Sequence, residues 1–259
     1  MSSQFKMQNA KCKCSVMRST GANAAAPSAP TIRIPLNLHV ACCILHSVVL
    51  AATFLVTSVA AAGQTTPHGR LFPPQDLGLL EGPDRDKWQK PDQIMDALSI
   101  ADGSRVADIG AGAGWFTIRL ARRVGPRGVV YAQDVQRQML EAIRRRVAKE
   151  GLENVEPRLG QGSNPNLPPG ALDAVLVVDV YPEVEDRVTF LKNLGTSLKP
   201  NGRIGIVNYK PGNGGPGPGP NEGVRVARDV VEADAAAAGL RVLGREDFLP
   251  YQYLLVLGR

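Results

Sequence analysis

The part of the chain that follows residue 62 contains no cysteine. All four cysteines, Cys12, Cys14, Cys42 and Cys43, lie in the first 62 residues. A disulfide framework and a cysteine metal site are therefore excluded from the body of the protein. We predict no metal site in this chain.

The first 62 residues in turn lack aspartate and glutamate. They hold five basic residues, which leaves 25 basic and 24 acidic residues in the rest of a chain whose net charge is +6. The body is thus nearly neutral and lacks the electrostatic footprint of a nucleic-acid-binding protein. Aromatic residues make up 5% of the chain, and no base-stacking cluster is evident among them. We therefore predict no nucleic-acid partner.

An apolar run over residues 40–62 follows the basic stretch. Small residues end this run in an A-x-A-like pattern, which is typical of a secretory signal peptide. We predict a basic leader over residues 1–62, with export (periplasmic or secreted) after cleavage near Ala62. Because about 20 apolar residues suffice to span a bilayer, membrane association through an uncleaved anchor at residues 40–62 is the alternative. Met17 is an alternative first residue.

Residues 63–87 are rich in glycine, proline and charge, which predicts a linker. The main domain is expected over residues 88–259. Its first helix is predicted over residues 91–99, because Pro91 is well placed in a first helical turn. Trp88, directly before it, either covers a ligand or attaches this segment to the core.

Residues 105–120 are the most informative stretch of the chain. The apolar run at residues 106–109 indicates a buried strand, and a helical pattern begins after residue 114. Gly110, Gly112 and Gly114 stand between them at alternate positions. Such glycines cost backbone entropy on folding, so they indicate a turn that lets a ligand approach the backbone. The helix that follows presents unpaired N–H groups and its positive dipole end to that ligand.

The identity of this ligand depends on two further positions. The dinucleotide fingerprint G-x-G-x-x-G would require glycine at residue 115, where the chain has Trp115. Asp108, two residues before the first glycine, instead suits a ligand that carries an ammonium and a sulfonium group. The stretch resembles the first motif of the class I S-adenosylmethionine-dependent methyltransferases, hydrophobic-x-D/E-x-G-x-G-x-G, at every position. A nicotinamide-dependent oxidoreductase on a similar sheet is the alternative.

This resemblance implies S-adenosyl-L-methionine as cofactor, with Asp108 and the three glycines at its methionine end. Asp134 ends the second predicted strand, where a carboxylate can accept hydrogen bonds from adjacent ribose hydroxyls. The third strand is predicted over residues 155–159. Gln161 and Gly162 follow it, where the family usually carries an acid that contacts the adenine amino group. The amide oxygen of Gln161 can accept from that amine.

The fourth predicted strand, residues 171–179, ends in Asp179, and Tyr181 and Glu183 follow. Ligands bind at the carboxyl ends of strands in open α/β sheets, so these three residues are the candidate catalytic residues beside a methyl acceptor. Asp179 is also expected to border the cofactor. Asp179 or Glu183 can deprotonate an acceptor hydroxyl or amine where the geometry allows. Loop polarity without chemistry is the alternative.

The remaining pattern predicts a helix over residues 185–198, a tight turn at 199–202, a strand at 203–209, a helix at 222–238, and strands at 241–248 and 251–257. The predicted fold class is therefore α/β: a Rossmann-like, seven-stranded, mostly parallel sheet with a C-terminal antiparallel strand pair and helices on both faces. The predicted function is methyl transfer to a small-molecule acceptor. A non-catalytic exported binding module with the same fold is the remaining alternative.

Overall fold

The computed structural model describes residues 82, 84–212, 219–220 and 222–259. The predicted leader at residues 1–62 and most of the predicted linker at 63–87 lie outside the described residues, so these boundaries and the export of the chain stay predictions. Within the described ranges, no helix has both the length and the apolar character needed to cross a bilayer.

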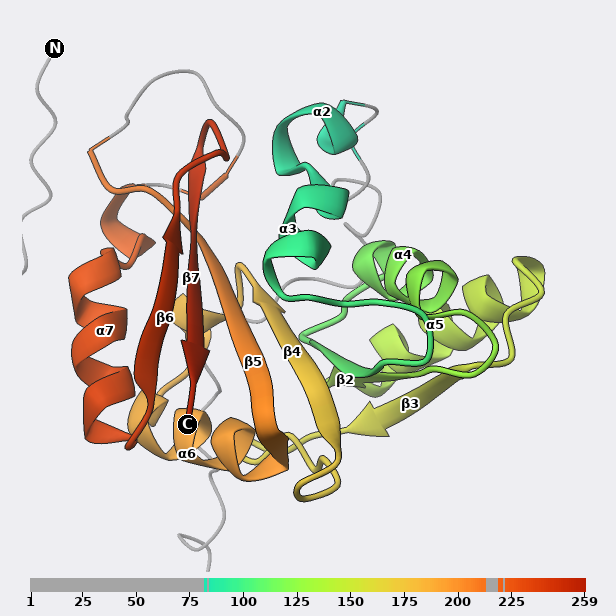
Figure 1. Ribbon diagram of the computed structural model, residues 1–259. Helices are drawn as coiled ribbons and strands as arrows, with labels where there is room; N and C mark the ends of the chain where they lie inside the picture. The colour runs from blue at the N-terminus through green and yellow to red at the C-terminus, as the bar shows by residue number, and fades with distance from the viewer. Residues whose placement is uncertain (1–81, 83, 213–218, 221) are drawn as a thin grey trace, which may run out of the picture. The chain divides into compact units, whose positions relative to one another are not determined.

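Seven strands of the described part form one sheet in the order β3-β2-β1-β4-β5-β7-β6 (Figure 1). The pairs β3-β2, β2-β1, β1-β4 and β4-β5 are parallel, whereas β7 runs antiparallel to both β5 and β6. This arrangement confirms the predicted fold class. The strands are β1 (Arg105–Ile109), β2 (Val129–Asp134), β3 (Val155–Leu159), β4 (Leu172–Val178), β5 (Leu198–Tyr209), β6 (Arg241–Glu246) and β7 (Gln252–Gly258).

Helices cover both faces of the sheet. One face carries α3, α4 and α5, and the other carries α6 and α7 (Figure 1). The helices are α2 (Arg85–Gln89), α3 (Pro91–Ala97), α4 (Trp115–Val124), α5 (Arg137–Lys149), α6 (Arg187–Ser197) and α7 (Arg228–Ala237), with short 3-10 turns η2 (Tyr181–Glu183) and η3 (Glu222–Val224).

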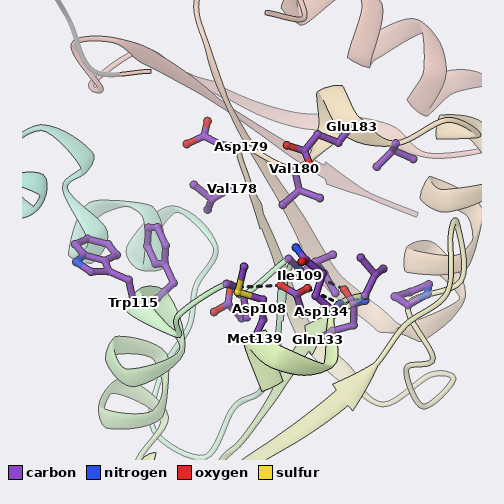
Figure 2. A pocket seen from close by; sticks show the side chains of 18 of the residues that line it. Asp108, Ile109, Trp115, Gln133, Asp134, Met139, Val178, Asp179, Val180 and Glu183 are labelled. Carbon is purple, nitrogen blue, oxygen red and sulfur yellow. Dashed lines mark hydrogen bonds between the residues drawn. The ribbon is translucent and has the colours of Figure 1, made fainter. Parts of the chain in front are cut away.

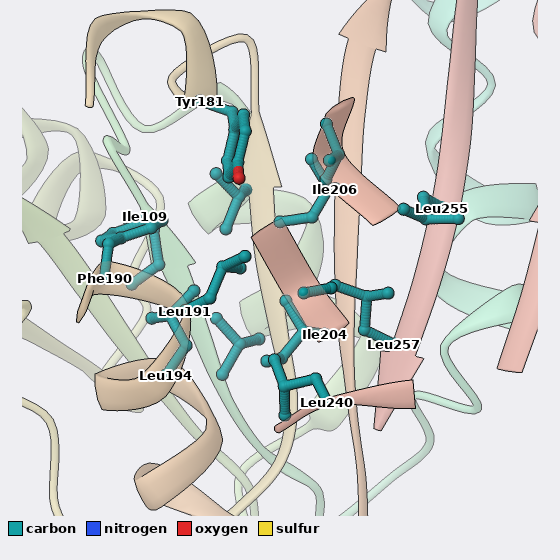
Figure 3. Close-up of a cluster of buried hydrophobic side chains, with 14 of the residues drawn as sticks. Ile109, Tyr181, Phe190, Leu191, Leu194, Ile204, Ile206, Leu240, Leu255 and Leu257 are labelled. Carbon is teal, nitrogen blue, oxygen red and sulfur yellow. The ribbon is translucent and has the colours of Figure 1, made fainter. Parts of the chain in front are cut away.

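Alternation along the central strands supplies both cores. Side chains of a strand point to opposite faces in turn, so Val106 of β1 joins the cluster under α3 and α4, and its neighbour Ala107 joins the cluster under α6 and α7. Figure 3 shows the second cluster, in which Leu191 and Leu194 of α6 lie among side chains of the sheet. The sheet is therefore buried on both faces, as a mostly parallel sheet requires.

Three element boundaries differ from prediction. Residues 199–202, predicted as a tight turn, lie inside β5, where the pairing with β4 jumps from Leu172↔Leu198 to Ala174↔Arg203. The extra residues form a bulge in the strand instead of a turn before it. The last helix begins at Arg228 instead of residue 222, because its N-cap Ala227 has extended backbone angles. A helix, α2, also begins inside the predicted linker.

Candidate active site

A cavity of about 790 Å³ opens at the carboxyl ends of β1, β2 and β4. Seven of the predicted site residues line it together. They are Asp108, Gly110, Gly112, Asp134, Gly162, Asp179 and Glu183. Figure 2 shows Asp108 and Asp134 on one side of the cavity and Asp179 and Glu183 on the opposite side. We call the first side, with Asp108, Gly110, Gly112 and Asp134, the glycine side.

The glycine bend between β1 and α4 has the conformation that its sequence predicts. Gly110, Gly112 and Gly114 all have positive φ, at 63°, 54° and 82°. A Cβ atom on Gly110 would lie 2.2 Å from Cγ2 of Val180, so a side chain there would force Val180 to move. Gly114 does not line the cavity; it is the left-handed N-cap of α4. The bend thus leaves backbone, without side chains, facing the cavity at two of its three glycines.

Asp108 is the second-to-last residue of β1 and is buried, at 3% exposure. The Thr117 hydroxyl of α4 donates a 2.6 Å hydrogen bond to Oδ2 of Asp108. Burial raises the pKa of Asp108 to about 7, against the opposing effects of the Thr117 hydrogen bond and of Arg85. A cationic ligand in this cavity would favour the ionised form of Asp108.

Asp134 ends β2, and backbone donors fix its carboxylate. The N–H of Gly112 donates to Oδ2 at 3.0 Å, and the N–H of Gln136 donates to Oδ1 at 2.9 Å. Burial raises the pKa of this carboxyl, and these hydrogen bonds oppose the rise. Since each carboxylate oxygen has a second lone pair, Asp134 can still accept from two ligand hydroxyls in the cavity. The aspartate and the glycine bend therefore hold each other in place.

The loop after β3 contributes one of its two predicted residues, Gly162, and two that were not predicted. Gly162, Ser163 and Pro165 line the cavity, whereas Gln161 is exposed and does not line it. The backbone of Gln161 instead pairs with Asn164 in an isolated antiparallel bridge. That bridge turns the loop so that Gly162 and Ser163, one and two residues later, face the cavity. The structure therefore places the predicted Gly162 and the unpredicted Ser163 at the cavity, and it does not place the Gln161 side chain there.

Asp179, directly after β4, has the left-handed backbone conformation with φ 58°, which is uncommon for a residue with a side chain. Its N–H donates to the carbonyl of Val207, and Nε2 of Gln252 donates to both carboxylate oxygens at 2.8 Å. Burial raises the pKa of Asp179 to about 7, opposed by Arg85 and by the Gln252 hydrogen bond. Asp179 is therefore poised to exchange a proton near neutral pH.

Glu183 and Tyr181 lie in η2, but only Glu183 faces the cavity. Burial raises the pKa of Glu183 to about 7, and nearby Asp134 adds to the rise. Tyr181 is fully buried in the cluster under α6 and α7 (Figure 3), and its hydroxyl donates to Asp234 at 2.7 Å. The turn thus directs the Tyr181 ring away from the cavity, and the structure does not bring this predicted catalytic residue to the site.

Several cavity residues were absent from the predicted site. Arg85, Trp115, Phe116 and Tyr209 line it, and so does Trp88, for which a covering role was one of two interpretations. The rings of Trp88 and Tyr209 have centroids 6.3 Å apart. We call Arg85, Trp88, Asp179, Glu183 and Tyr209 the aromatic side of the cavity.

Arg85 is the cationic member of the aromatic side. Its guanidinium lies 4.2 Å from the centroid of the Trp115 ring. Burial lowers the pKa of Arg85, whereas Asp179, Tyr209 and Asp108 act in the opposite direction. One partly buried cation thus lies within electrostatic reach of a carboxylate on each side of the cavity. Among the described residues, no group of three histidine, cysteine or acidic side chains could hold a metal ion.

Comparisons with known proteins agree on the class of this domain. Residues 106–202 match the model of a family described as a methyltransferase domain. The chain is 31% identical over 119 residues to nocamycin O-methyltransferase of Saccharothrix syringae, covering 46% of this chain and 42% of that protein. It is 30% identical over 118 residues to demethylmenaquinone methyltransferase of Geobacillus sp. (strain WCH70), covering 46% and 50%. The chain spans about half the length of these curated relatives.

A solved structure matches over a larger share of the chain. It is the crystal structure of a SAM-dependent methyltransferase from Aquifex aeolicus, with a TM-score of 0.68 and 27% identity. The match covers 72% of this chain and 98% of that one. These matches favour the methyltransferase interpretation of the glycine bend over the oxidoreductase interpretation.

Proposed function

We propose that the chain carries a class I S-adenosylmethionine-dependent methyltransferase domain and transfers a methyl group from S-adenosylmethionine to a small-molecule acceptor. One observation carries the proposal. A single cavity has a glycine-built side that suits the methyl donor and an opposite side with two carboxyl groups of pKa about 7.

The residues of the glycine side fit the donor. Gly110 and Gly112 keep side chains out of the cavity, so the backbone itself faces the ligand. Asp108 supplies a carboxyl to the cationic methionine end, and Asp134 supplies acceptors to the ribose hydroxyls. When bound, S-adenosylmethionine supplies an electrophilic methyl group on a sulfonium. The protein has to align the acceptor with that group and remove the acceptor's proton.

The aromatic side supports the acceptor assignment. Trp88 and Tyr209 offer apolar ring surface, and Asp179 and Glu183 are the groups there that can take a proton. The names of the two curated relatives, nocamycin O-methyltransferase and demethylmenaquinone methyltransferase, support a small molecule as acceptor. We propose that the acceptor lies against the Trp88 and Tyr209 rings and gives its proton to Asp179, with Glu183 as the second candidate base.

Calorimetric titration of the full chain with S-adenosylmethionine, S-adenosylhomocysteine and NAD tests the donor assignment. We expect both sulfur nucleosides to bind and NAD not to bind. Tight binding of NAD alone would contradict the proposal. Turnover is then followed by mass spectrometry as S-adenosylhomocysteine formed in the presence of panels of phenols, quinols and amines. Binding of the donor without turnover on any panel would favour the non-catalytic binding module.

A further inference from the structure

Four side chains, those of Arg85, Gln89, Gln252 and Asp179, form a continuous, partly buried series of hydrogen bonds behind the aromatic side, which we call the relay. Nε of Arg85 donates to Oε1 of Gln89 at 2.7 Å. Nε2 of Gln89 donates to Oε1 of Gln252 at 2.7 Å, and Nε2 of Gln252 donates to both oxygens of Asp179 at 2.8 Å. Both glutamines are fully buried, at 0% exposure. The relay joins α2, β7 and the end of β4, which are distant in the sequence.

The charged groups at the two ends of the relay determine how the amide groups of both glutamines are oriented. A guanidinium can only donate and an ionised carboxylate can only accept. Nε2 of Gln252 must therefore face Asp179, which leaves its oxygen toward Gln89. The same argument places the nitrogen of Gln89 toward Gln252 and its oxygen toward Arg85. Each amide can satisfy its buried neighbour in one orientation only, so neither can rotate without leaving a buried polar atom unpaired.

The relay ends at the Asp179 carboxylate, whose conformation and charge depend on the groups around it. Asp179 holds the uncommon left-handed conformation, which persists only where the surroundings enforce it. The groups that act on it are Arg85 from α2, Gln252 from β7, Glu183 from η2 and Tyr209 from β5. Arg85 and Gln252 favour the charged form of Asp179, whereas Glu183 and burial disfavour it. Removal of the Gln252 donor would shift this balance toward the protonated form.

We propose that Gln89 and Gln252 are positioning residues, which aim the Asp179 carboxylate into the cavity and keep it ionised to take the acceptor's proton. The proton-accepting role of Asp179 rests on the proposed function, whereas the hydrogen-bonded support does not. Arg85, Gln89 and Gln252 lie outside residues 106–202, which match the methyltransferase family model. The supporting residues of the relay therefore lie outside the part of the chain that matches the family model.

The test measures the pKa of Asp179 in the full chain by NMR, with aspartate labelled by carbon-13 at the side-chain carboxyl. The Asp179→Asn variant identifies the resonance. In Gln252→Met, which keeps the length of the side chain and removes its donors, we expect the pKa of Asp179 to rise by about one to two units. Gln89→Met should raise it less, because Gln252 keeps its donor but loses the partner that fixes its orientation. Gln93→Met, on an exposed position of α3, should leave it unchanged.

An unchanged pKa of Asp179 in Gln252→Met would overturn the relay. Circular dichroism and binding of S-adenosylhomocysteine show whether the variant is folded, and Gln252→Leu serves as a second donor-free variant if Gln252→Met is not. The outcomes separate the two proposals. If the wild-type chain fails to bind S-adenosylhomocysteine, the proposed function fails, while the pKa comparison still decides the relay. If binding persists and the pKa does not move, only the relay fails.

Discussion

The two sides of the cavity are built in different ways. The glycine side comes mostly from one short stretch, in which backbone conformation and small residues shape the surface. The aromatic side is assembled from side chains of α2, β5, η2 and the end of β4, held by contacts such as the Gln89–Gln252 hydrogen bond, whose partners are 163 residues apart. The comparison implies that the glycine side depends on local backbone geometry and the aromatic side on the packing of the whole sheet.

The sharpest way to break the glycine side is Gly110→Ala. Alanine at this position would have to adopt the left-handed backbone conformation, and its methyl group would collide with Val180. We therefore expect the free energy of unfolding to fall by about 2–5 kcal/mol. Chemical denaturation measures the change. Gly151→Ala is the matched control, because Gly151 has the same φ of 63° and open space around it. A further Val180→Ala change should recover part of the loss. Equal costs at both glycines would show that the contact with Val180 is unimportant.

Asp134→Ala removes the side chain that links the glycine bend to β2. The N–H groups of Gly112 and Gln136 lose their acceptor, and a bound ribose loses its partner. We expect affinity for S-adenosylhomocysteine to fall by about 1–3 kcal/mol, measured by calorimetry. Asp173→Ala is a suitable control, because Asp173 lies in β4 outside the residues that line the cavity and pairs with Lys199. An unchanged affinity in Asp134→Ala would remove Asp134 from the cofactor site.

Both sides of the cavity carry carboxyl groups that are expected to titrate near neutral pH. The pKa values of Asp108, Asp179 and Glu183 are raised to about 7 in the folded chain. The folded state therefore holds these protons to higher pH than the unfolded state does. The free energy of unfolding should fall as pH rises from about 4 to about 7 and then level off.

Protonation of these carboxyl groups also removes negative charge that would attract a cationic ligand. We expect affinity for S-adenosylmethionine to rise about tenfold between pH 6 and pH 8, as one carboxyl of pKa about 7 ionises. S-adenosylhomocysteine lacks the sulfonium charge and should show a smaller rise. Calorimetry in matched buffers measures both slopes. Identical slopes for the two nucleosides would show that the carboxylates do not sense the sulfonium.

The smallest expected effect belongs to Tyr181→Phe, outside the cavity. Loss of the hydrogen bond to Asp234 should lower the free energy of unfolding by about 0.5–1.5 kcal/mol. Affinity for S-adenosylhomocysteine should stay unchanged, because the ring keeps its place in the buried cluster. A loss of affinity with unchanged stability would return Tyr181 to the site. Denaturation and calorimetry on one protein preparation give both values.

This difference between the two sides also explains what the sequence could predict. Sequence analysis could assign Asp108, Gly110 and Gly112 to the site because the strand, the turn and the helix that place them are adjacent in the chain. The sheet itself follows from apolar runs and the spacing of turns. Arg85 and Gln252 carry no such signal, because a buried arginine or glutamine in a short helix or a last strand looks like any polar residue until the sheet brings them together.

Two differences between the predicted site and the structure arise within single loops. Gln161 and Tyr181 were predicted from their position in loops that follow strand ends. Which side chain of such a loop faces the cavity depends on one turn of backbone. The bridge between Gln161 and Asn164 exposes Gln161, and η2 buries Tyr181 while leaving Glu183 at the cavity. Sequence position predicted the correct loops but could not choose among neighbouring residues within them.

The two indole rings of the chain have a practical consequence. The sequence contains two tryptophans, Trp88 and Trp115, and both line the cavity. The tryptophan fluorescence of the unlabelled protein therefore originates at the site itself. A compound that enters should quench or shift this emission, so a library can be sorted for acceptors before any product is known. The variants Trp88→Phe and Trp115→Phe each keep a single tryptophan. Comparing them would show which of the two indole rings the compound contacts.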